Sequence, residues 1–308
     1  METKRFLRYL APNLVTFGSL CFGMLSILSS IEGRYCTAAW FIIFSVLADK
    51  LDGLVARVLK GTSQFGVQMD SFADALNFGV APAVLWYSFL SRAPGLHFAE
   101  DDWRTFLAVA CCLWVVAVTF RLARYNIVGD NPKYKKIFIG VPTTLAGGTL
   151  VALFLAALKY GRPEIQAAAQ ATFDEPYLLG SSFHLGVGIW HAWPVLVLVG
   201  AYLMVSTVKI PKLGPSRSRP VTVFVLANVL AGYVLGFAML LPEYLFATSG
   251  AWTVGSLIWS QFSTQAKGIK PPAIFPDEVV PPVDLAEPEV SDLPELDDET
   301  DSSVATAK

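Results

Sequence analysis

Long apolar runs separated by short polar connections dominate the chain from residue 12 to residue 262. Hydropathy predicts helical spans at about residues 12–31, 36–59, 69–90, 105–126, 140–159, 186–208, 221–241 and 245–262. Each run is close to the roughly 20 residues that a helix needs to cross a bilayer. The pattern predicts an all-α, polytopic transmembrane helical bundle of about eight spans, in which Gly79 and Pro82 loosen or kink the third. Because only a short loop around Pro242 separates the last two runs, six or seven spans remain open.

The character of the sequence changes after residue 262. From about Gly268 onward Pro, Asp and Glu dominate and aromatic residues almost disappear. Such a segment cannot bury enough apolar surface to offset the entropy of ordering itself. We therefore expect a transmembrane domain at residues 1–262 and an acidic, Pro-rich, disordered cytoplasmic tail at residues 263–308.

Composition supports the membrane interpretation, since 54% of the residues are hydrophobic and only 16% are charged. The net charge is -2, but acidic and basic residues are unevenly distributed along the chain, because residues 271–308 hold 11 of the 25 acids and a single base. Basic residues gather in alternate connections, as at Lys4, Lys133 and Lys209. The positive-inside tendency therefore predicts an integral membrane protein with both termini in the cytoplasm. We expect no nucleic-acid partner.

Four carboxylates stand inside this apolar sequence. Asp49 and Asp52 are three residues apart and Asp70 and Asp74 are four apart, so each pair lies on one face of its predicted helix. Two facing pairs would form an oxygen-only cage, which favours Mg²⁺ or Mn²⁺ over zinc. An Asp near the bilayer centre costs about 2.5–3.5 kcal/mol to insert, so packing is a poor explanation for four of them. The alternative is a structural cluster paired with neighbouring bases.

Small residues accompany these carboxylates. Gly53 and Ala56 each follow one of the first two by a helical turn, which leaves room for a bulky ligand against the backbone. Arg57 ends the same segment, and Gly66 follows in a short polar turn. The full spacing is D-x2-D-G-x2-A-R-x8-G-x3-D-x3-D. A chance match to so many fixed positions is far less common than a match to a short glycine motif.

The spacing resembles the signature of the CDP-alcohol phosphatidyltransferase family, matched at Asp49, Asp52, Gly53, Ala56, Arg57, Gly66, Asp70 and Asp74. The resemblance implies a membrane enzyme with a six-helix catalytic core that transfers the phosphatidyl group of a CDP-linked lipid to an alcohol and releases CMP. It implies Asp74 as the general base and Asp49, Asp52 and Asp70 as ligands of two Mg²⁺ or Mn²⁺ ions, with Asp74 also able to touch a metal. Binding of CDP by the motif residues Asp52, Gly53, Ala56, Arg57 and Gly66, a homodimer and a bacterial inner-membrane location are further implications.

Polar residues at the same predicted membrane level extend this candidate site. Asn13 and Thr16 enter from the first span, and we expect them to contribute to the nucleotide pocket, although Asn13 could only cap or bond locally. Arg121 and Arg124 lie on one face at the end of the fourth span. A guanidinium engages carboxylate or phosphate in bidentate fashion, so both are candidates for acceptor or phosphate binding. Anchoring to lipid headgroups is the alternative.

Further stretches resemble the serine branch of the family, which uses CDP-diacylglycerol. They are PNLVTFGSLCFGMLSI, MDSFADALNFGVAPA, FRLARYNI, FIGVP and LMVSTVKIP, and Asn77 stands where that branch would have a serine. The implied reaction converts CDP-diacylglycerol and L-serine into phosphatidylserine and CMP. Glycerol 3-phosphate or inositol phosphate remains an alternative acceptor, because a phosphorylated acceptor would also need arginines. From another class, a membrane cation transporter would also place acids in the membrane, but a bare ion does not require the clearance at Gly53 and Ala56.

Overall fold

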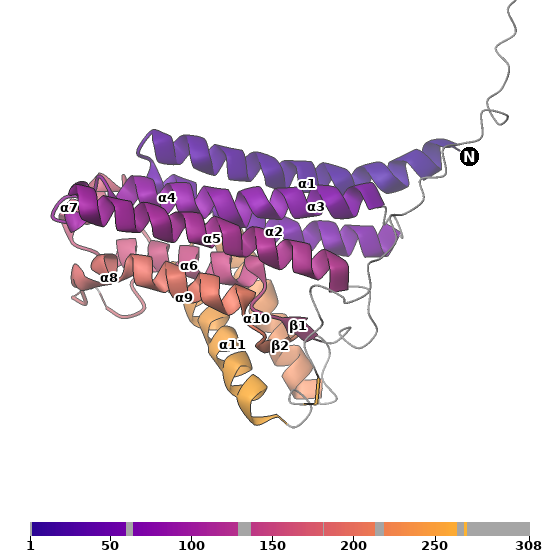
Figure 1. The fold of residues 1–308 in the computed structure, drawn as a ribbon. Helices are drawn as coiled ribbons and strands as arrows, with labels where there is room; N and C mark the ends of the chain where they lie inside the picture. The colour runs from indigo at the N-terminus through magenta and orange to yellow at the C-terminus, as the bar shows by residue number, and fades with distance from the viewer. Residues whose placement is uncertain are drawn as a thin grey trace, which may run out of the picture. The chain divides into compact units, whose positions relative to one another are not determined.

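The computed structural model describes residues 2–59, 64–128, 137–180, 182–212, 219–263 and 268–269, without the side chains of residues 2–12, 54–59 and 64. Helices make up most of it (Figure 1). In chain order the elements are α1 (Glu2–Ile31), α2 (Tyr35–Leu59), α3 (Gln64–Asp74), the π-helix η1 (Ala75–Val80), α4 (Ala81–Leu90), the 3₁₀-helix η2 (His97–Ala99), α5 (Asp101–Val128), β1 (Ile137–Ile139), α6 (Thr143–Lys159), α7 (Pro163–Ala168), α8 (Gly188–His191), α9 (Trp193–Val205), β2 (Lys209–Pro211), α10 (Arg219–Phe237) and α11 (Pro242–Phe262).

Each of the eight predicted spans coincides with a helix or a run of helices, so the predicted helical architecture is confirmed. Some bounds differ, because α1 already begins at Glu2 and the third span begins at Gln64. Within the described ranges, three helical segments are long and apolar enough to cross a membrane by themselves, namely Asn13–Ile31, Asp101–Ile127 and Arg219–Phe237. The sequence pattern did not reveal the short antiparallel pair of strands β1 and β2.

The third predicted span is one helical run with a π-helical segment in its middle. The π-helix begins directly after Asp74, and α4 follows it with Pro82 in its first turn. The Trp114 Nε1 of α5 donates a hydrogen bond of 2.9 Å to the Phe78 carbonyl oxygen inside this segment. The irregularity predicted here from Gly79 and Pro82 is therefore a π-helix. Such segments occur frequently at functional sites.

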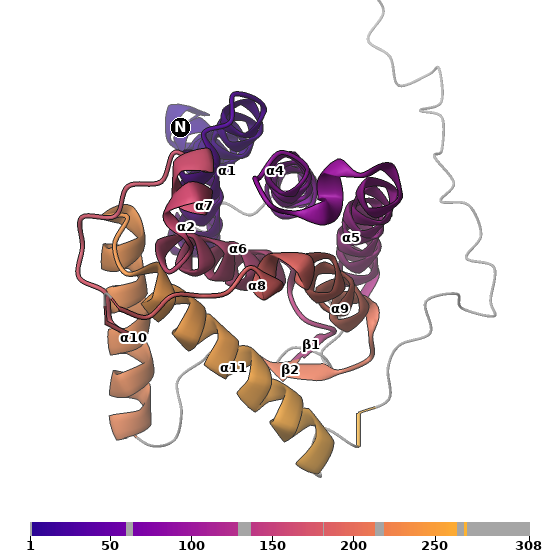
Figure 2. The same cartoon turned by 90° about the vertical axis from the view of Figure 1, so that its left-hand side faces the viewer.

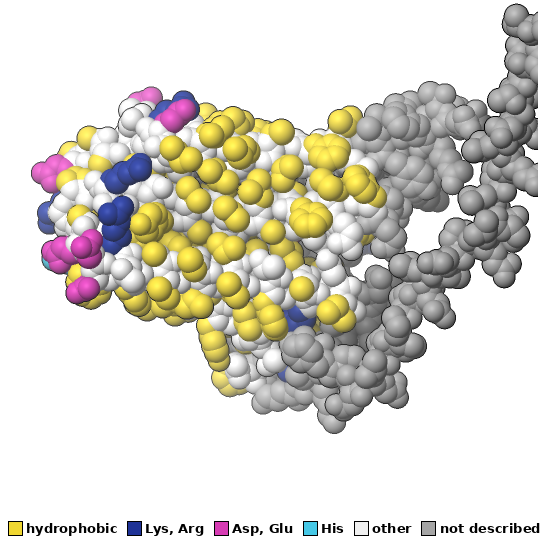
Figure 3. Space-filling model, turned by 45° about the horizontal axis from the view of Figure 1, so that its top comes forward, with side chains coloured by type: hydrophobic (Ala, Val, Ile, Leu, Met, Phe, Trp, Pro, Cys, Tyr) yellow, Lys and Arg dark blue, Asp and Glu magenta, His cyan; other side chains and the backbone are white. Residues whose placement is uncertain are grey.

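Helix α1 turns its small and polar residues inward. Thr16, Ser19, Gly23, Ser26 and Ser30 recur every three or four residues and are buried. The exposed side carries large apolar residues, at Leu14, Phe17, Met24, Leu25, Leu28 and Ile31. Small residues let helices approach closely in lipid, where apolar side chains can face outward without cost. Figure 3 shows an apolar band along the molecule, with charged side chains gathered at one end. These features identify an integral membrane protein.

Aromatic packing holds the centre of the bundle together. Trp86 of α4 meets Trp114 of α5 edge to face at 5.1 Å between ring centroids. Phe154 of α6 contacts Trp190 of α8 and Trp193 of α9 at 5.5 and 5.6 Å. All five rings are fully buried. Figure 2 shows α6 between α2, α9 and α11, so neighbouring helices hold α6 from several sides.

A buried ionic cluster fastens α11 to α6 at the end of α6 that is remote from the carboxylates. The Lys159 ammonium lies 3.0 Å from a Glu243 carboxylate oxygen and 3.3 Å from one of Glu175. The Tyr160 hydroxyl donates to Glu243 at 3.1 Å, and the Leu178 amide donates to the same carboxylate. Because a buried charge is tolerated only when it is paired and hydrogen-bonded, this cluster fixes where α11 begins.

The predicted tail at residues 263–308 lies outside the described residues, apart from Ser263, Gly268 and Ile269. Its disorder and the division of the chain at residue 262 stay predictions.

Candidate active site

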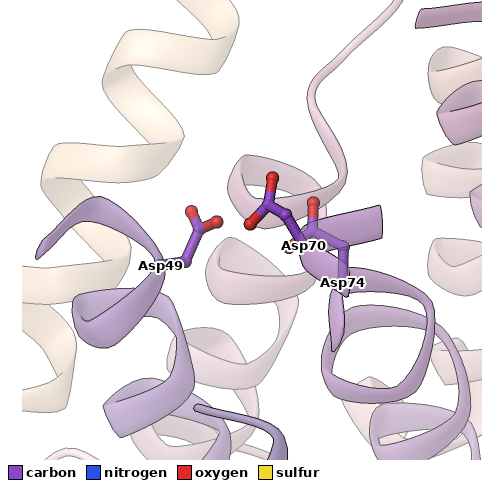
Figure 4. Close-up of side chains that lie close together, drawn as sticks. All are labelled: Asp49, Asp70 and Asp74. Atoms are coloured by element: carbon purple, nitrogen blue, oxygen red, sulfur yellow. The ribbon is translucent and has the colours of Figure 1, made fainter. Parts of the chain in front are cut away.

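Three of the four predicted carboxylates converge. Asp49 comes from α2 and Asp70 and Asp74 come from α3, and one carboxylate oxygen of each lies within 4.8 Å of the others. Figure 4 shows these side chains directed toward a shared space between the two helices. Asp74 is buried, whereas Asp49 and Asp70 are half-buried. The spacing of three and four residues thus brings carboxylates from two helices together, as the sequence predicts.

The first turn of α6 faces this cluster with two threonines that the sequence analysis did not single out. The Thr143 hydroxyl donates to Asp74 Oδ2 at 3.5 Å, and the Thr144 hydroxyl donates to Asp49 Oδ2 at 3.3 Å. The positive end of the α6 dipole therefore also points toward the acids. The sequence contains one signal that could have identified these two residues, because the Thr-Thr pair directly follows Pro142, where a helix begins.

Asp52 lies apart from the cluster of three. Its Oδ2 accepts a hydrogen bond of 3.0 Å from the Thr16 hydroxyl of α1, and both residues are buried. Asn13 lies half-buried one helical turn before Thr16. The contact ties α1 to α2 beside the carboxylates, and the parts of Thr16 and Asn13 in a nucleotide pocket stay predictions. Asp52 hydrogen-bonds to α1 and is not one of the three carboxylates with oxygens within 4.8 Å of one another, and its part as a metal ligand stays a prediction.

The expected clearance beside the carboxylates is present at Gly53. A methyl group added there would meet no atom of the described residues within 4 Å, so these residues leave the backbone of α2 open at this point. Gly66 is half-buried near the start of α3. The side chains of Ala56 and Arg57 lie outside the described part of the structure, and their predicted contacts with CDP stay predictions.

The cluster carries an excess of negative charge. The exposed Lys50 ammonium lies 3.5 Å from Asp49, the one ion pair that the described residues make with the three carboxylates. Two ionised carboxylates 4.8 Å apart repel each other by about 3 kcal/mol at an effective dielectric constant of 20. With Mg–O distances of about 2.1 Å, opposite ligand oxygens around Mg²⁺ stand about 4.2 Å apart. Both the all-oxygen donor set and its spacing therefore suit a hard divalent cation such as Mg²⁺ or Mn²⁺.

Arg121 lies near Asp74, and its guanidinium makes no ion pair within 4.0 Å with a described carboxylate. Its Nη1 donates to the Thr143 hydroxyl at 3.4 Å, and its guanidinium lies over the rings of Tyr125 and Phe138 at 5.1 and 5.7 Å. The Lys212 ammonium lies 4.6 Å from the Phe138 ring, and burial together with Arg121 lowers the pKa of Lys212. Two cations thus share one pair of rings, and an anion between them would relieve their mutual repulsion.

Arg124 has a different environment from the one predicted for it. Its Nη1 donates to the carbonyl oxygens of Val205 and Ser206, and its Nη2 donates to those of Ile139 and Met204. The shortest of these bonds is 2.7 Å. Both terminal nitrogens are therefore occupied by the ends of β1 and α9. These contacts give Arg124 a structural task and make Arg121 the better candidate for binding an acceptor or phosphate.

Gly140 makes this arrangement possible. It has φ +74°, and a side chain there would overlap the Met204 carbonyl oxygen and Arg124 Nη2. The left-handed conformation is open to glycine at little cost. The turn from β1 into α6 can therefore pass close to the arginine while delivering Thr143 and Thr144 to the carboxylates.

A helical membrane protein with acidic side chains from two neighbouring spans around a common space belongs to a class that manipulates cations or phosphates within the bilayer. The sequence pattern of the family described as CDP-alcohol phosphatidyltransferase matches residues 9–173, which includes all four carboxylates and both arginines. The chain belongs to the CDP-alcohol phosphatidyltransferase family and is a phosphatidyltransferase enzyme.

Relatives with assigned activities are similar to half or more of this chain, or nearly so. A CDP-diacylglycerol–serine O-phosphatidyltransferase of Helicobacter pylori J99 is 34% identical over 203 residues, which cover 66% of this chain and 72% of that protein. The enzyme of the same description from Mycobacterium leprae is 37% identical over 155 residues, or 49% of this chain and 48% of its own length. An archaetidylserine synthase of Methanothermobacter thermautotrophicus is 34% identical over 158 residues, covering 50% and 62%.

Proposed function

We propose that the protein transfers the phosphatidyl group of CDP-diacylglycerol to the hydroxyl of L-serine and releases CMP. The observation that carries the proposal is the convergence of Asp49, Asp70 and Asp74 within 4.8 Å beside the open backbone at Gly53. A cage of oxygen ligands next to such clearance suits a diphosphate ester rather than a bare ion. Similarity to serine phosphatidyltransferases of two bacteria supports serine as the acceptor.

In this proposal Asp49, Asp52, Asp70 and Asp74 hold two divalent ions, Mg²⁺ or Mn²⁺. Ions bound there would neutralise the diphosphate oxygens and the charge that develops on CMP. The three carboxylates that converge supply the oxygen ligands that such ions prefer. Asp52, whose Oδ2 accepts a hydrogen bond from Thr16, borders the space where the nucleotide would lie. Asn13, Thr16, Gly53, Ala56, Arg57 and Gly66 complete the proposed CDP-binding surface.

Asp74 is the proposed general base. Transfer requires that the serine hydroxyl oxygen bond to the phosphatidyl phosphorus while the bond from that phosphorus to the CMP oxygen breaks. The hydroxyl proton passes to the Asp74 carboxylate, and CMP leaves with the electron pair of the broken bond. Burial of Asp74 and the hydrogen bond from Thr143 would keep its carboxylate aimed into the shared space.

Arg121 and Lys212 are the proposed site for the serine carboxylate. They flank the Tyr125 and Phe138 rings, and Thr143 links Arg121 directly to Asp74. A carboxylate bound by Arg121 and Lys212 would therefore be separated from Asp74 by little more than the Thr143 hydroxyl. This short separation fits serine, in which two bonds separate the carboxylate carbon from the hydroxyl-bearing carbon.

We further propose that both termini lie in the cytoplasm, that the membrane is the bacterial inner membrane and that the protein acts as a homodimer. The distribution of basic connections supports the orientation. The carboxylates would then open toward the compartment that supplies CDP-linked lipid, serine and divalent ions.

The test supplies membranes containing the protein with CDP-diacylglycerol, Mn²⁺ and one alcohol at a time, and measures CMP. We expect release with L-serine, none with glycerol 3-phosphate or inositol phosphate, and loss of release on chelation. Release only with a phosphorylated alcohol would refute the acceptor assignment. Metal uptake into vesicles without CMP release under any condition would favour a cation transporter instead.

A further inference from the structure

A second polar layer lies one helical turn below the carboxylates. It consists of Ser19 of α1, Ser45 of α2 and Asn77 of the π-helix, all of which are buried. Asn77 Nδ2 donates to Ser19 Oγ at 2.8 Å, and Ser45 Oγ donates to the Ser19 carbonyl oxygen at 3.3 Å. This layer joins the three elements that carry the candidate site, because α1 holds Thr16 and the π-helix directly follows Asp74.

Asn77 is closely fitted to Gly23 of α1. A side chain at position 23 would overlap Asn77 Oδ1 and would lie 3.1 Å from Asn77 Cγ. Turning the Asn77 side chain away would break its bond to Ser19, so the overlap has no simple relief. The closest approach of α1 to the π-helix therefore depends on the missing side chain of Gly23.

Packing alone does not explain an asparagine at this position. Asn77 Oδ1 is buried and receives no hydrogen bond from any described residue. A buried amide oxygen without a donor is unfavourable, and an apolar residue of similar size would avoid that cost. The asparagine instead supplies a directional bond to α1, which an apolar residue could not provide.

We propose that Asn77, acting through Ser19 and Gly23, is a positioning residue that sets the distance between α1 and the helix of Asp70 and Asp74. Ser19 follows Thr16 by three residues, and Asn77 follows Asp74 by three. A shift of α1 against the π-helix therefore moves Thr16, together with its partner Asp52, relative to the base. The inference rests on the proposed function, and it predicts an effect on the nucleotide side of the site rather than on serine.

The experiment compares Asn77→Ala, Gly23→Ala and the double variant Gly23→Ala/Asn77→Ser, with Ser26→Ala as a matched control on the same face of α1. Steady-state rates are measured in detergent micelles at saturating Mn²⁺, per amount of monodisperse protein. We expect both single variants to raise the KM for CDP-diacylglycerol on the order of tenfold, because small displacements of binding groups have large kinetic effects. The KM for serine should change less than about twofold, as should both constants in Ser26→Ala.

The double variant separates positioning from general damage. Serine at position 77 has no atom in the space of Oδ1, and its hydroxyl can reach Ser19 after a small inward shift of α1. We expect it to restore most of the kcat/KM that Gly23→Ala loses. A double variant as impaired as Gly23→Ala, or single variants with less folded protein but unchanged KM values, would overturn the proposal.

Failure of the proposed function would look different. If the wild-type protein uses another alcohol, the serine assignment is wrong, but the KM for CDP-diacylglycerol still reports on Asn77. If it releases no CMP at all, thermal unfolding of the wild type, Gly23→Ala, Asn77→Ser and the double variant Gly23→Ala/Asn77→Ser measures the coupling between positions 23 and 77. Additive effects of the two substitutions would then refute the contact.

Discussion

Asp70→Asn removes one negative charge from the carboxylate cluster and leaves the size of the side chain nearly unchanged. Asp70 faces Asp49 and Asp74 within 4.8 Å, and each ionised pair at that distance repels by about 3 kcal/mol at an effective dielectric constant of 20. Asp70 is half-buried, so solvent screening and protonation of one carboxylate reduce the net relief to about 1 kcal/mol. The amide keeps the size of the side chain. The metal-free variant should therefore be more stable than the wild type, although it is inactive.

The assay is thermal unfolding of the detergent-solubilised protein in a chelator and in millimolar Mn²⁺. For a domain of this size, about 1 kcal/mol corresponds to an increase in Tm of about 2–4 °C in chelator. Mn²⁺ should raise the Tm of the wild type, because a ligand that binds only the folded state stabilises it, and should raise that of Asp70→Asn much less. Asp102→Asn, on the exposed start of α5, is the control and should match the wild type under both conditions. An unchanged or lowered Tm in chelator, or an undiminished response to Mn²⁺, would refute the reasoning.

Three further substitutions probe other parts of the structure. Arg121→Gln should raise the KM for serine at least tenfold and leave the KM for CDP-diacylglycerol nearly unchanged in steady-state kinetics. Equal increases of both KM values would contradict a binding site for the serine carboxylate. Arg124→Gln should destabilise the protein by about 2–3 kcal/mol, because charge-assisted bonds to four carbonyls are lost, and an unchanged Tm would argue against that structural task. Lys159→Met should cost about 3–5 kcal/mol by leaving the Glu243 and Glu175 charges unpaired. Lys159→Met/Glu243→Leu should recover only the part of this loss that the Glu243 charge causes, because Glu175 stays unpaired, and thermal unfolding would show the difference.

Much of the fold was predictable from apolar runs, because a bilayer demands helices of nearly fixed length. The carboxylate cluster was predictable for a similar reason, since a spacing of three or four residues places side chains on one face of a helix. Which face meets which neighbour depends on packing between helices. Sequence spacing places Asp52 on one face with Asp49, and it does not show the hydrogen bond that Asp52 accepts from Thr16 of α1.

The arginines show the same limit. Arg121 and Arg124 are three residues apart and have the same chemistry, so sequence spacing gives them the same task. They differ in what surrounds them. The ends of β1 and α9 enclose Arg124 with carbonyl oxygens, and only the turn at Gly140 allows that enclosure. Strands of three residues leave almost no periodic signal, which is why β1 and β2 were not predicted.

Helix α1 buries its small residues and exposes its large apolar ones, and this determines which substitutions it tolerates. In a water-soluble protein, enlarging a surface residue is harmless and shrinking a core residue is damaging. Along α1 the sensitive positions are those with the smallest residues, because Gly23 and its serine neighbours touch other helices through little more than backbone. A saturation mutagenesis profile of this helix should therefore show intolerance to added volume along one stripe, and indifference among Leu, Phe, Ile and Met along the opposite one.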